Sequence, residues 1–415
     1  MARKAHVSVK GYVADLLGWF KLPKQRSAWI DQGNPNLDTL DPIMDLANRL
    51  HSGIIPVLIQ EVKEEGPFAR SYIEWNGSIW ALVEEGPCAR SYILKPAEGQ
   101  HLPLHYAGQY LSAKFDREGR RIARPFTISS GPMSAFEDNL VKITLMKREG
   151  DPLNAFIWDT WKAGMALDIE LPFGNFYYSK IRDAAHVVGI AEGARVAAFR
   201  SMIIDMQKTR RPERLTLLYS SPGAEDTLFR DELNSLAGVS DGRVRVCHVL
   251  SGAEAGSSGI EKGPINGELI KGLVPDYREA SFFMSGSSAF MEGLGGELDS
   301  LGISTTRRRT DVSGPGPLKD RKEKTYTITV QFGLEEQQVP AKSTETVEAA
   351  LEKAGLAIDT RCRGGECSWC RSKLVTGKVY AQGAGVRAKD REAGFIHPCA
   401  AYPESDLTLR VFTRL

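Results

Sequence analysis

Four cysteines near the C-terminal end constrain this chain more than any other feature. They follow a CxxxxCxxC…C spacing and are Cys362, Cys367, Cys370 and Cys399. Four thiolates at this spacing hold a 2Fe-2S cluster in iron–sulfur proteins. Gly364 and Gly365 lie between the first two thiolates, where a positive φ brings amide N–H groups close to cluster sulfurs. The sequence therefore predicts a cluster that carries single electrons.

A structural zinc site is the alternative interpretation of the same cysteines. Cys367-Ser-Trp-Cys370 is a CxxC pair, and a fourth thiolate could complete a tetrahedron around zinc. The surrounding pattern favours the iron–sulfur cluster. Residues 326–332 alternate like a strand, residues 345–354 have helical spacing, and residues 407–412 read as a closing strand. We expect a small β-grasp domain over 326–415. With these elements the segment resembles plant-type ferredoxins, and the resemblance implies that all four cysteines are iron ligands.

Length and composition limit the number of domains, the partners and the location of the chain. At 415 residues it has room for about three domains, and 53 basic residues against 52 acidic ones give no field that would attract nucleic acid. The two isolated cysteines, Cys88 and Cys247, indicate a reducing compartment and not a disulfide framework. No apolar run is long enough to span a membrane, and the start lacks a secretory signal. We expect a cytoplasmic protein without a transmembrane segment.

Three features of the sequence have no obvious chemistry: an arm, a linker-like segment and a repeat. Residues 1–52 form a basic and apolar N-terminal arm, and residues 304–325 are rich in charge, Gly and Pro, as linkers are. EEGPFARSYI at 64–73 recurs as EEGPCARSYI at 84–93. Asn76-Gly77 between the two copies is a strong two-residue hairpin signal, so we expect an added β-hairpin there.

Residues 53–180 read as a β-barrel with three short motifs. Strand-like segments lie at 109–115 and 139–146, separated by turn residues. The motifs are RPFTISS at 124–130, GDPLNAF at 150–156 and LPFGNF at 171–176. Gly150 precedes a helical segment whose N-terminal N–H groups can bind phosphate.

In this order the three motifs resemble the flavin domain of the ferredoxin–NADP reductase superfamily. The resemblance implies that Arg124 binds the flavin phosphate, that Phe126 lies against the isoalloxazine and that Thr127, a catalytic candidate, bonds near N5. It also places three further residues at the phosphate site: Ser130, Gly150 and Asn154. Phe126 replaces the usual Tyr and Asn154 the usual Ser or Thr, and both can still serve. We expect FAD, with FMN as the other possibility.

Residues 185–303 alternate apolar strands with helical stretches, as a doubly wound α/β domain does. In the superfamily this domain binds NAD(P)H, and the resemblance assigns three glycines to that site: Gly189, Gly193 and Gly286. Ser285, a second catalytic candidate, replaces the usual Cys beside the nicotinamide. Glu192 and Arg195 stand where the family has Gly, and Glu192 adds bulk and negative charge near a diphosphate.

The fold class is thus a multidomain one: a flavin β-barrel, a doubly wound nucleotide domain and a β-grasp ferredoxin domain. The order resembles phthalate dioxygenase reductase-type enzymes. It implies that electrons pass from NAD(P)H through flavin and a 2Fe-2S cluster to a partner protein, which could be an oxygenase, a corrinoid protein or another acceptor. The alternative is a non-catalytic relay subunit whose nucleotide site is degenerate.

Overall fold

The structure is a computed structural model that describes residues 53–412 with short gaps. The gaps are 66–69, 76–77, 85–88, 148–150, 211, 224–225, 252–259, 312–313, 315–317, 319–321, 357 and 382–387. The expected N-terminal arm, the turn at Asn76-Gly77, Cys88 and Gly150 lie outside the described residues. Within the described ranges, no helix has the length and apolar character that a membrane crossing needs.

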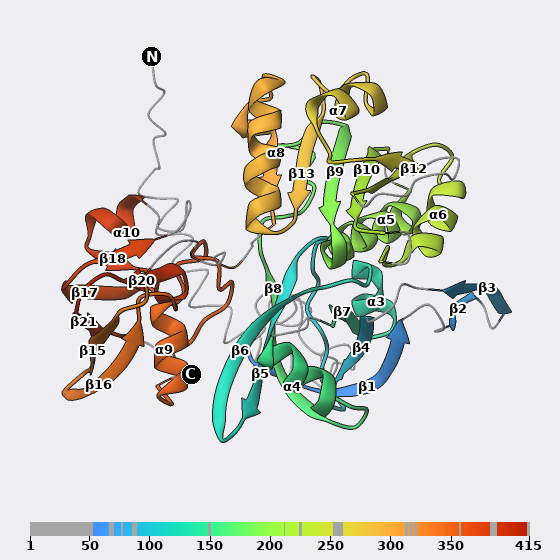
Figure 1. The fold of residues 1–415 in the computed structure, drawn as a ribbon. Helices are drawn as coiled ribbons and strands as arrows, with labels where there is room; N and C mark the ends of the chain where they lie inside the picture. Colours follow the sequence, from blue (N-terminus) through green and yellow to red (C-terminus); the bar gives the residue numbers. More distant parts are fainter. Residues whose placement is uncertain are drawn as a thin grey trace, which may run out of the picture. The chain divides into compact units, whose positions relative to one another are not determined.

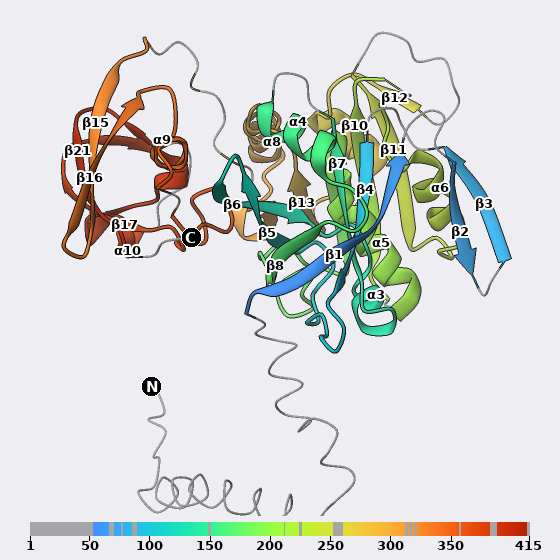
Figure 2. The same cartoon turned by 90° about the horizontal axis from the view of Figure 1, so that it is seen from below.

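Six antiparallel strands form the expected β-barrel (Figure 1). They run in the order β6 (Arg120–Thr127), β5 (Tyr110–Arg117), β8 (Ala166–Phe173), β1 (Ile55–Glu65), β4 (Ala89–Pro96) and β7 (Val141–Met146). The chain beyond β6 closes the sheet, because Ser129 N donates to Lys142 O at 2.8 Å and Ile128 bridges Ile143. Alternate strand residues fill the interior, and α4 (Pro152–Thr160) covers one side with Ile157. Figure 2 shows how these strands cross one another.

A parallel six-stranded sheet forms the nucleotide domain. Its order is β12 (Ile260–Lys262), β11 (Val244–Leu250), β10 (Arg214–Ser221), β9 (His186–Glu192), β13 (Ser281–Ser285) and β14 (Arg308–Thr310). α5 (Ala197–Thr209) and α6 (Arg230–Gly238) cover one face, while α7 (Gly267–Leu273) and α8 (Ser288–Ser300) cover the other (Figure 1). The strand order reverses between β9 and β13, and ligands of such sheets bind beyond the carboxyl ends of those strands.

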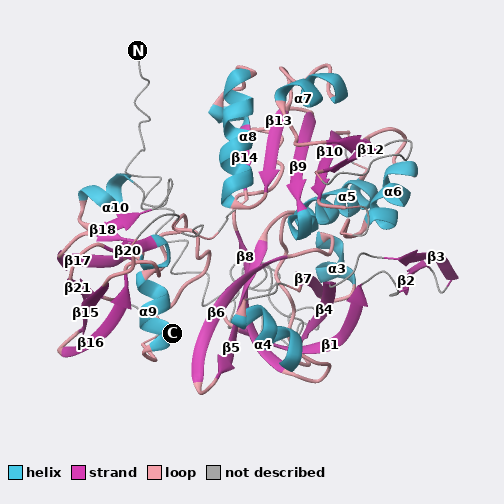
Figure 3. Ribbon diagram, viewed as in Figure 1, coloured by secondary structure: helices cyan, strands magenta, loops and turns pink. Residues whose placement is uncertain are grey.

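The C-terminal domain is a β-grasp fold. A mixed sheet has the order β16 (Glu335–Lys342), β15 (Thr325–Phe332), β21 (Leu407–Arg410), β17 (Ser372–Thr376) and β19 (Phe395–Ile396). α9 (Val347–Lys353) packs on it, capped by Thr346 Oγ1, which accepts from Ala349 N at 3.2 Å. β18 (Val379–Ala381), β20 (Ala401–Pro403) and α10 (Ala388–Glu392) complete the domain (Figure 3). The three-part fold class is confirmed.

The structure confirms one further expectation and corrects another. β2 (Arg70–Trp75) and β3 (Ser78–Glu84) pair antiparallel, with Trp75 opposite Ser78, so the hairpin around residues 76–77 is confirmed. The expected linker at 304–325 begins too early and is corrected here. β14 pairs with β13 inside that range, so the nucleotide sheet continues to Thr310 and the connecting segment starts after it.

Candidate active site

One cavity of about 340 Å³ brings residues of all three folds together. Phe126 and Thr127 line it from β6, Arg195 lines it from the turn after β9, and Cys362 lines it from the ferredoxin domain. Its volume lies at the lower end of the range of pockets that bury a ligand of drug or cofactor size. Five charged residues line it, three arginines and two aspartates: Arg124, Arg195, Arg363, Asp151 and Asp311.

The barrel side of the cavity contains most of the expected flavin residues. Phe126 lies 5.5 Å from Trp161 between ring centroids, which leaves Phe126 fixed at the wall. Asn154 is buried and its Nδ2 donates to Met146 O at 2.8 Å. Ser130 is not among the lining residues, because its Oγ accepts from Lys142 N at 3.0 Å in the barrel seam.

Two features of the expected phosphate site differ from what the motifs suggest. The helix N-terminus of α4 is already capped, since Asp151 Oδ1 accepts from Leu153 N at 3.0 Å and Asn154 N at 3.1 Å. Arg124 forms a two-pronged pair with Glu352 of α9, with both nitrogen–oxygen distances 3.0 Å. Burial lowers the pKa of Arg124, but a guanidinium stays protonated in proteins. Arg124 is therefore charged at the cavity wall, and Glu352 already pairs with that charge.

The nucleotide side is built at the point where the strand order reverses. Gly193 follows β9 with φ +56°, and Glu192 just before it accepts from Ser287 N at 2.7 Å. Ser285 ends β13 and its Oγ donates to Asp311 Oδ2 at 2.8 Å. The site thus has two carboxylates where a dinucleotide would approach, and Arg195 Nη1 lies 3.9 Å from Asp311.

Gly189 and Gly286 are required by packing. A Cβ on Gly189 would lie 2.6 Å from the Phe199 ring, and one on Gly286 would lie 2.3 Å from Phe290. Both contacts are far closer than van der Waals distance, so these glycines let α5 and α8 approach the sheet. Packing alone therefore requires glycine at both positions, whether or not a dinucleotide binds.

The four cysteine sulfurs lie close together, three on the loop 362–370 and the fourth, Cys399, in the short helical turn Pro398–Ala400. Cys370 Sγ lies 3.4 Å from Cys399 Sγ, and Cys362 is in contact with Cys367 and Cys399. Those two thiol contacts lower the pKa of Cys362 and raise the pKa values of Cys367 and Cys399, because the neighbouring thiols donate to the Cys362 sulfur. Gly365 has the expected positive φ, but Gly364 does not, and Arg363 takes the left-handed conformation instead.

Backbone amides point at the sulfurs, as an iron–sulfur loop requires. Gly364 N and Cys367 N donate to Cys362 Sγ at 3.4 and 3.5 Å, and Trp369 N donates to Cys367 Sγ at 3.4 Å. Such N–H···S bonds stabilise negative charge on cluster sulfurs. The residues present therefore suit a cluster with four thiolate ligands.

The barrel and the nucleotide domain are joined directly behind the flavin motif. Arg200 of α5 donates to Ser129 O at 2.6 Å while it pairs with the buried Glu232, and Ser201 Oγ donates to Ser130 O at 2.6 Å. These bonds fix the two folds on either side of the cavity. Sequence reasoning found neither this junction nor three residues of the cavity wall: Tyr110, Asp311 and Arg363.

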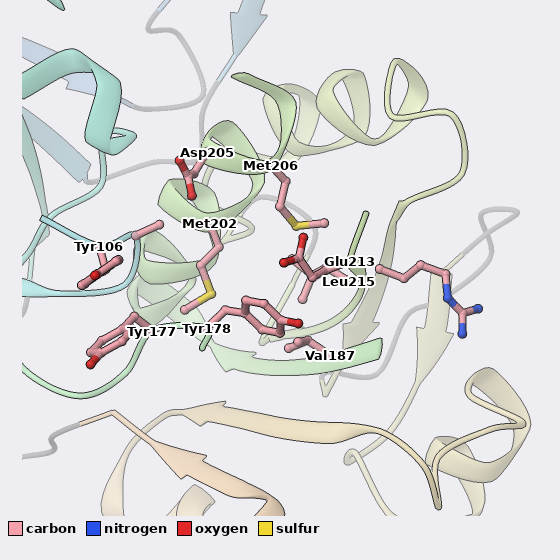
Figure 4. Close-up of a pocket in the computed structure, with 11 residues that line it drawn as sticks. Tyr106, Tyr177, Tyr178, Val187, Met202, Asp205, Met206, Glu213 and Leu215 are labelled. Atoms are coloured by element: carbon pink, nitrogen blue, oxygen red, sulfur yellow. The ribbon is translucent and has the colours of Figure 1, made fainter. Parts of the chain in front are cut away.

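A second cavity lies away from this chemistry. It measures about 40 Å³ and is lined by Tyr106, Tyr177, Met202 and Met206, among others (Figure 4). Tyr106 and Tyr177 stack on each other with ring centroids 4.6 Å apart, which leaves no gap for a base between them. This cavity has room for only a few water molecules and is too small to hold a flavin or a dinucleotide.

Comparison with known proteins agrees with this architecture. Residues 332–404 match the 2Fe-2S iron-sulfur cluster binding domain, and residues 190–295 match the oxidoreductase NAD-binding domain. The chain is an oxidoreductase with a 2Fe-2S domain. The predicted combination of domains is confirmed.

Two curated relatives of this oxidoreductase are reductase components of oxygenase systems. The glycine betaine monooxygenase reductase subunit of Pseudomonas aeruginosa is 24% identical over 322 residues, which cover 73% of this chain and 86% of the relative. The ferredoxin reductase component of 3-ketosteroid-9-alpha-monooxygenase from Rhodococcus rhodochrous is 23% identical over 314 residues, covering 72% and 85%.

Solved structures share the fold. Phthalate dioxygenase reductase superposes with a TM-score of 0.59 at 19% identity, over 87% of this chain and 98% of that one. The FAD/NAD binding domain of nitric oxide dioxygenase from Vibrio cholerae gives a TM-score of 0.51 at 19% identity, over 63% and 99%. The first match includes the ferredoxin fold, since it spans nearly the whole of that chain.

Proposed function

We propose that this oxidoreductase takes electrons from NAD(P)H and passes them through a bound flavin, FAD or FMN, and a 2Fe-2S cluster to a partner protein. The observation that carries the proposal is the shared cavity, where Phe126 of the barrel, Arg195 of the nucleotide domain and Cys362 of the cluster loop line one space. A flavin supplies the step that splits a two-electron hydride into single electrons.

We assign roles to the cavity residues on this basis. Phe126 provides an aromatic wall for a flat ring, and Thr127 provides a hydroxyl beside it. Arg124 and Arg363 line the cavity while Glu352 holds both, and we propose that they face a phosphate group. Ser285, held by Asp311, stands at the end of β13 where the nicotinamide would approach. The assignments of Ser130, Gly150, Asn154, Gly189, Gly193 and Gly286 to cofactor binding remain proposals.

We also propose that Cys362, Cys367, Cys370 and Cys399 are the four iron ligands. Their clustered sulfurs and the amide donors to Cys362 and Cys367 support this set. The partner that receives the electron is inferred by analogy with the relatives that serve oxygenases. A corrinoid protein or another carrier remains an alternative acceptor.

The domain limits and the location are proposals as well. We propose an arm at 1–52, a flavin barrel at 53–180, a nucleotide domain from 185 to 310, because β14 pairs with β13, and a ferredoxin domain over 326–415. We infer a cytoplasmic location, because the five cysteines of the described part are free and an iron–sulfur site of this kind needs reduced thiols. Cell fractionation tests it.

A second candidate is electron entry from another redox protein and not from a dinucleotide. The Glu192 contact to Ser287 N favours it, because a carboxylate there opposes a diphosphate. An anaerobic visible spectrum before and after NADH or NADPH separates the two. Bleaching of the flavin within seconds supports the first function, whereas an unchanged spectrum with both dinucleotides rejects it and leaves the relay.

A further inference from the structure

Two arginines flank the first cluster ligand, and both reach the flavin barrel. The segment reads Asp359-Thr-Arg361-Cys362-Arg363. Arg361 Nε lies 3.3 Å from Glu170 Oε2 of β8, and Arg363 Nε donates to Ala123 O of β6 at 2.9 Å. β5 lies between β6 and β8, so the two side chains straddle one strand of the barrel.

The strand between them contributes a third contact. Lys114 of β5 lies 3.3 Å from Asp359 Oδ1 and 3.5 Å from Glu170 Oε1. Asp359 therefore contacts β5, Arg361 contacts β8 and Arg363 contacts β6. Lys114 and Glu170 are 5% and 7% exposed, so their charges are desolvated, and removing one member of such a group leaves another uncompensated.

The same segment also contacts Trp369, at the other end of the cluster loop. Arg361 lies 3.3 Å above the Trp369 ring, and its other neighbour is the barrel residue Phe173, whose ring centroid is 4.4 Å away. Trp369 stands between the ligands Cys367 and Cys370, and its Nε1 donates to Asp359 Oδ2 at 2.8 Å. Movement of the segment would therefore move the ligand loop.

Arg363 adds a second anchor on the ferredoxin side. It pairs with Glu348 at 2.9 Å and with Glu352, and Glu352 in turn holds Arg124 of β6. Two carboxylates of α9, Glu348 and Glu352, thus bind Arg363 of the cluster loop, and Glu352 also binds Arg124 of the barrel. These contacts surround Cys362, which lines the cavity.

We propose that Asp359, Arg361 and Arg363 form a docking latch, which holds Cys362 and the cluster against the wall of the flavin cavity. They are positioning residues, because they act through the distance between two redox centres and touch no reacting atom. One electron leaves the reduced flavin and one arrives on the cluster, without any bond breaking. The rate of that step falls steeply as the gap widens. The inference rests on the proposed function, since it takes the cavity to hold the flavin.

The test measures the flavin-to-cluster step itself in the full-length holoprotein. Flavin is reduced photochemically by a short light pulse with EDTA as the sacrificial electron donor, and the appearance of the reduced cluster is followed by visible absorbance. We expect Glu170→Gln and Arg361→Gln each to slow this step at least tenfold. Because the two side chains share one contact, the double variant should slow the step by clearly less than the product of the two single effects.

Two further measurements separate positioning from a structural role. Iron content and the electron paramagnetic resonance signal of the reduced cluster should match the wild type in Glu170→Gln, since Glu170 lies on the barrel. Lys353→Gln is the matched control, because it neutralises an exposed cation whose partner Glu345 belongs to the same domain, and its rate should be unchanged.

Three results would overturn the latch: unchanged transfer in both single variants, multiplicative slowing in the double variant, or loss of iron in Glu170→Gln. If Arg361→Gln does not fold, Lys114→Met replaces it in the same cycle. The sacrificial donor supplies the electron in every case, without any dinucleotide. A wild-type flavin that NAD(P)H fails to reduce would therefore count against the proposed function alone.

Discussion

Ser285 and Asp311 join the ends of two neighbouring parallel strands through a 2.8 Å hydrogen bond from Ser285 Oγ to Asp311 Oδ2. Both residues are buried, at 0% and 7% exposure, and Asp311 also lines the cavity. The bond therefore fixes the end of β13 at the place where we propose that the nicotinamide approaches. A side chain in this position is held before any ligand arrives.

Ser285→Ala should remove that bond and leave the buried Asp311 carboxylate with one hydrogen bond fewer, although Arg195 still lies near it. We expect a loss of about 1–3 kcal/mol in the free energy of unfolding, measured by urea titration. Flavin reduction by NAD(P)H should also slow by about tenfold in stopped-flow absorbance. Ser285→Thr keeps the hydroxyl and should recover most of the stability, and equal stability of Ser285→Ala and wild type would contradict the assignment.

Cys367→Ser should abolish the cluster while the flavin stays bound. The substitution removes one of four thiolates, and a hydroxyl is a poor ligand for iron in this setting. The visible iron–sulfur bands and the iron content should fall to near zero, with the flavin spectrum intact. Cys247→Ser is the control, because Cys247 is buried in β11 and burial raises the pKa of its thiol. Unchanged iron in Cys367→Ser would refute the ligand set.

Glu192→Gln should tighten dinucleotide binding. The amide keeps an oxygen that can accept from Ser287 N, but it removes the negative charge from the diphosphate site. We expect a three- to tenfold lower Kd for NADH or NADPH by calorimetry. Asp299→Asn makes the same charge change at the other end of α8, where Asp299 is exposed, and should leave the Kd unchanged. Weaker binding in Glu192→Gln would contradict this prediction, because it would show that the Glu192 carboxylate assists dinucleotide binding.

The sequence predicts the local parts of this site well. Cysteine spacing determines which thiols meet, because a short loop limits how far ligands can separate, and strand periodicity places RPFTISS on a barrel strand. Tyr110, Arg363 and Asp311 were missed for a different reason. They enter the cavity through packing between folds, which leaves no local pattern in the chain.

Asp311 illustrates the limit most clearly. It follows a run of arginines and precedes a Gly- and Pro-rich stretch, a composition that indicates a linker. The strand before it, β14, has only three residues and carries no apolar periodicity, so its pairing with β13 cannot be recognised from sequence. Likewise Arg124 reads as a phosphate ligand by motif, while its pair with Glu352 depends on a helix far along the chain.

Gly189→Ala should destabilise the nucleotide domain whether or not a dinucleotide binds. The added Cβ would lie 2.6 Å from Phe199 and 3.2 Å from Leu217, in a buried layer with little room to adjust. We expect about 1–3 kcal/mol lower stability by urea titration. Gly295→Ala is the control, because no atom lies within 4 Å of its Cβ position on α8, and it should be neutral or slightly stabilising.

His105 should make the protein sensitive to mild acid. It is 6% exposed, and burial lowers its pKa from the ordinary 6.5 to about 4. Neither ring nitrogen has a hydrogen-bond partner among the described residues. The unfolded chain therefore binds more protons than the folded one between pH 6.5 and 4, so stability falls as the pH drops through that window.

The size of the effect follows from the two pKa values. Because of His105, the free energy of unfolding should fall by about 2 kcal/mol when the pH drops from 7 to 5. His105→Gln cannot become charged, so its stability should change by about 2 kcal/mol less than the wild type over the same interval. Urea titrations of both proteins at the two pH values measure this difference. An identical pH dependence in the variant would mean that His105 is protonated in the folded protein at pH 5.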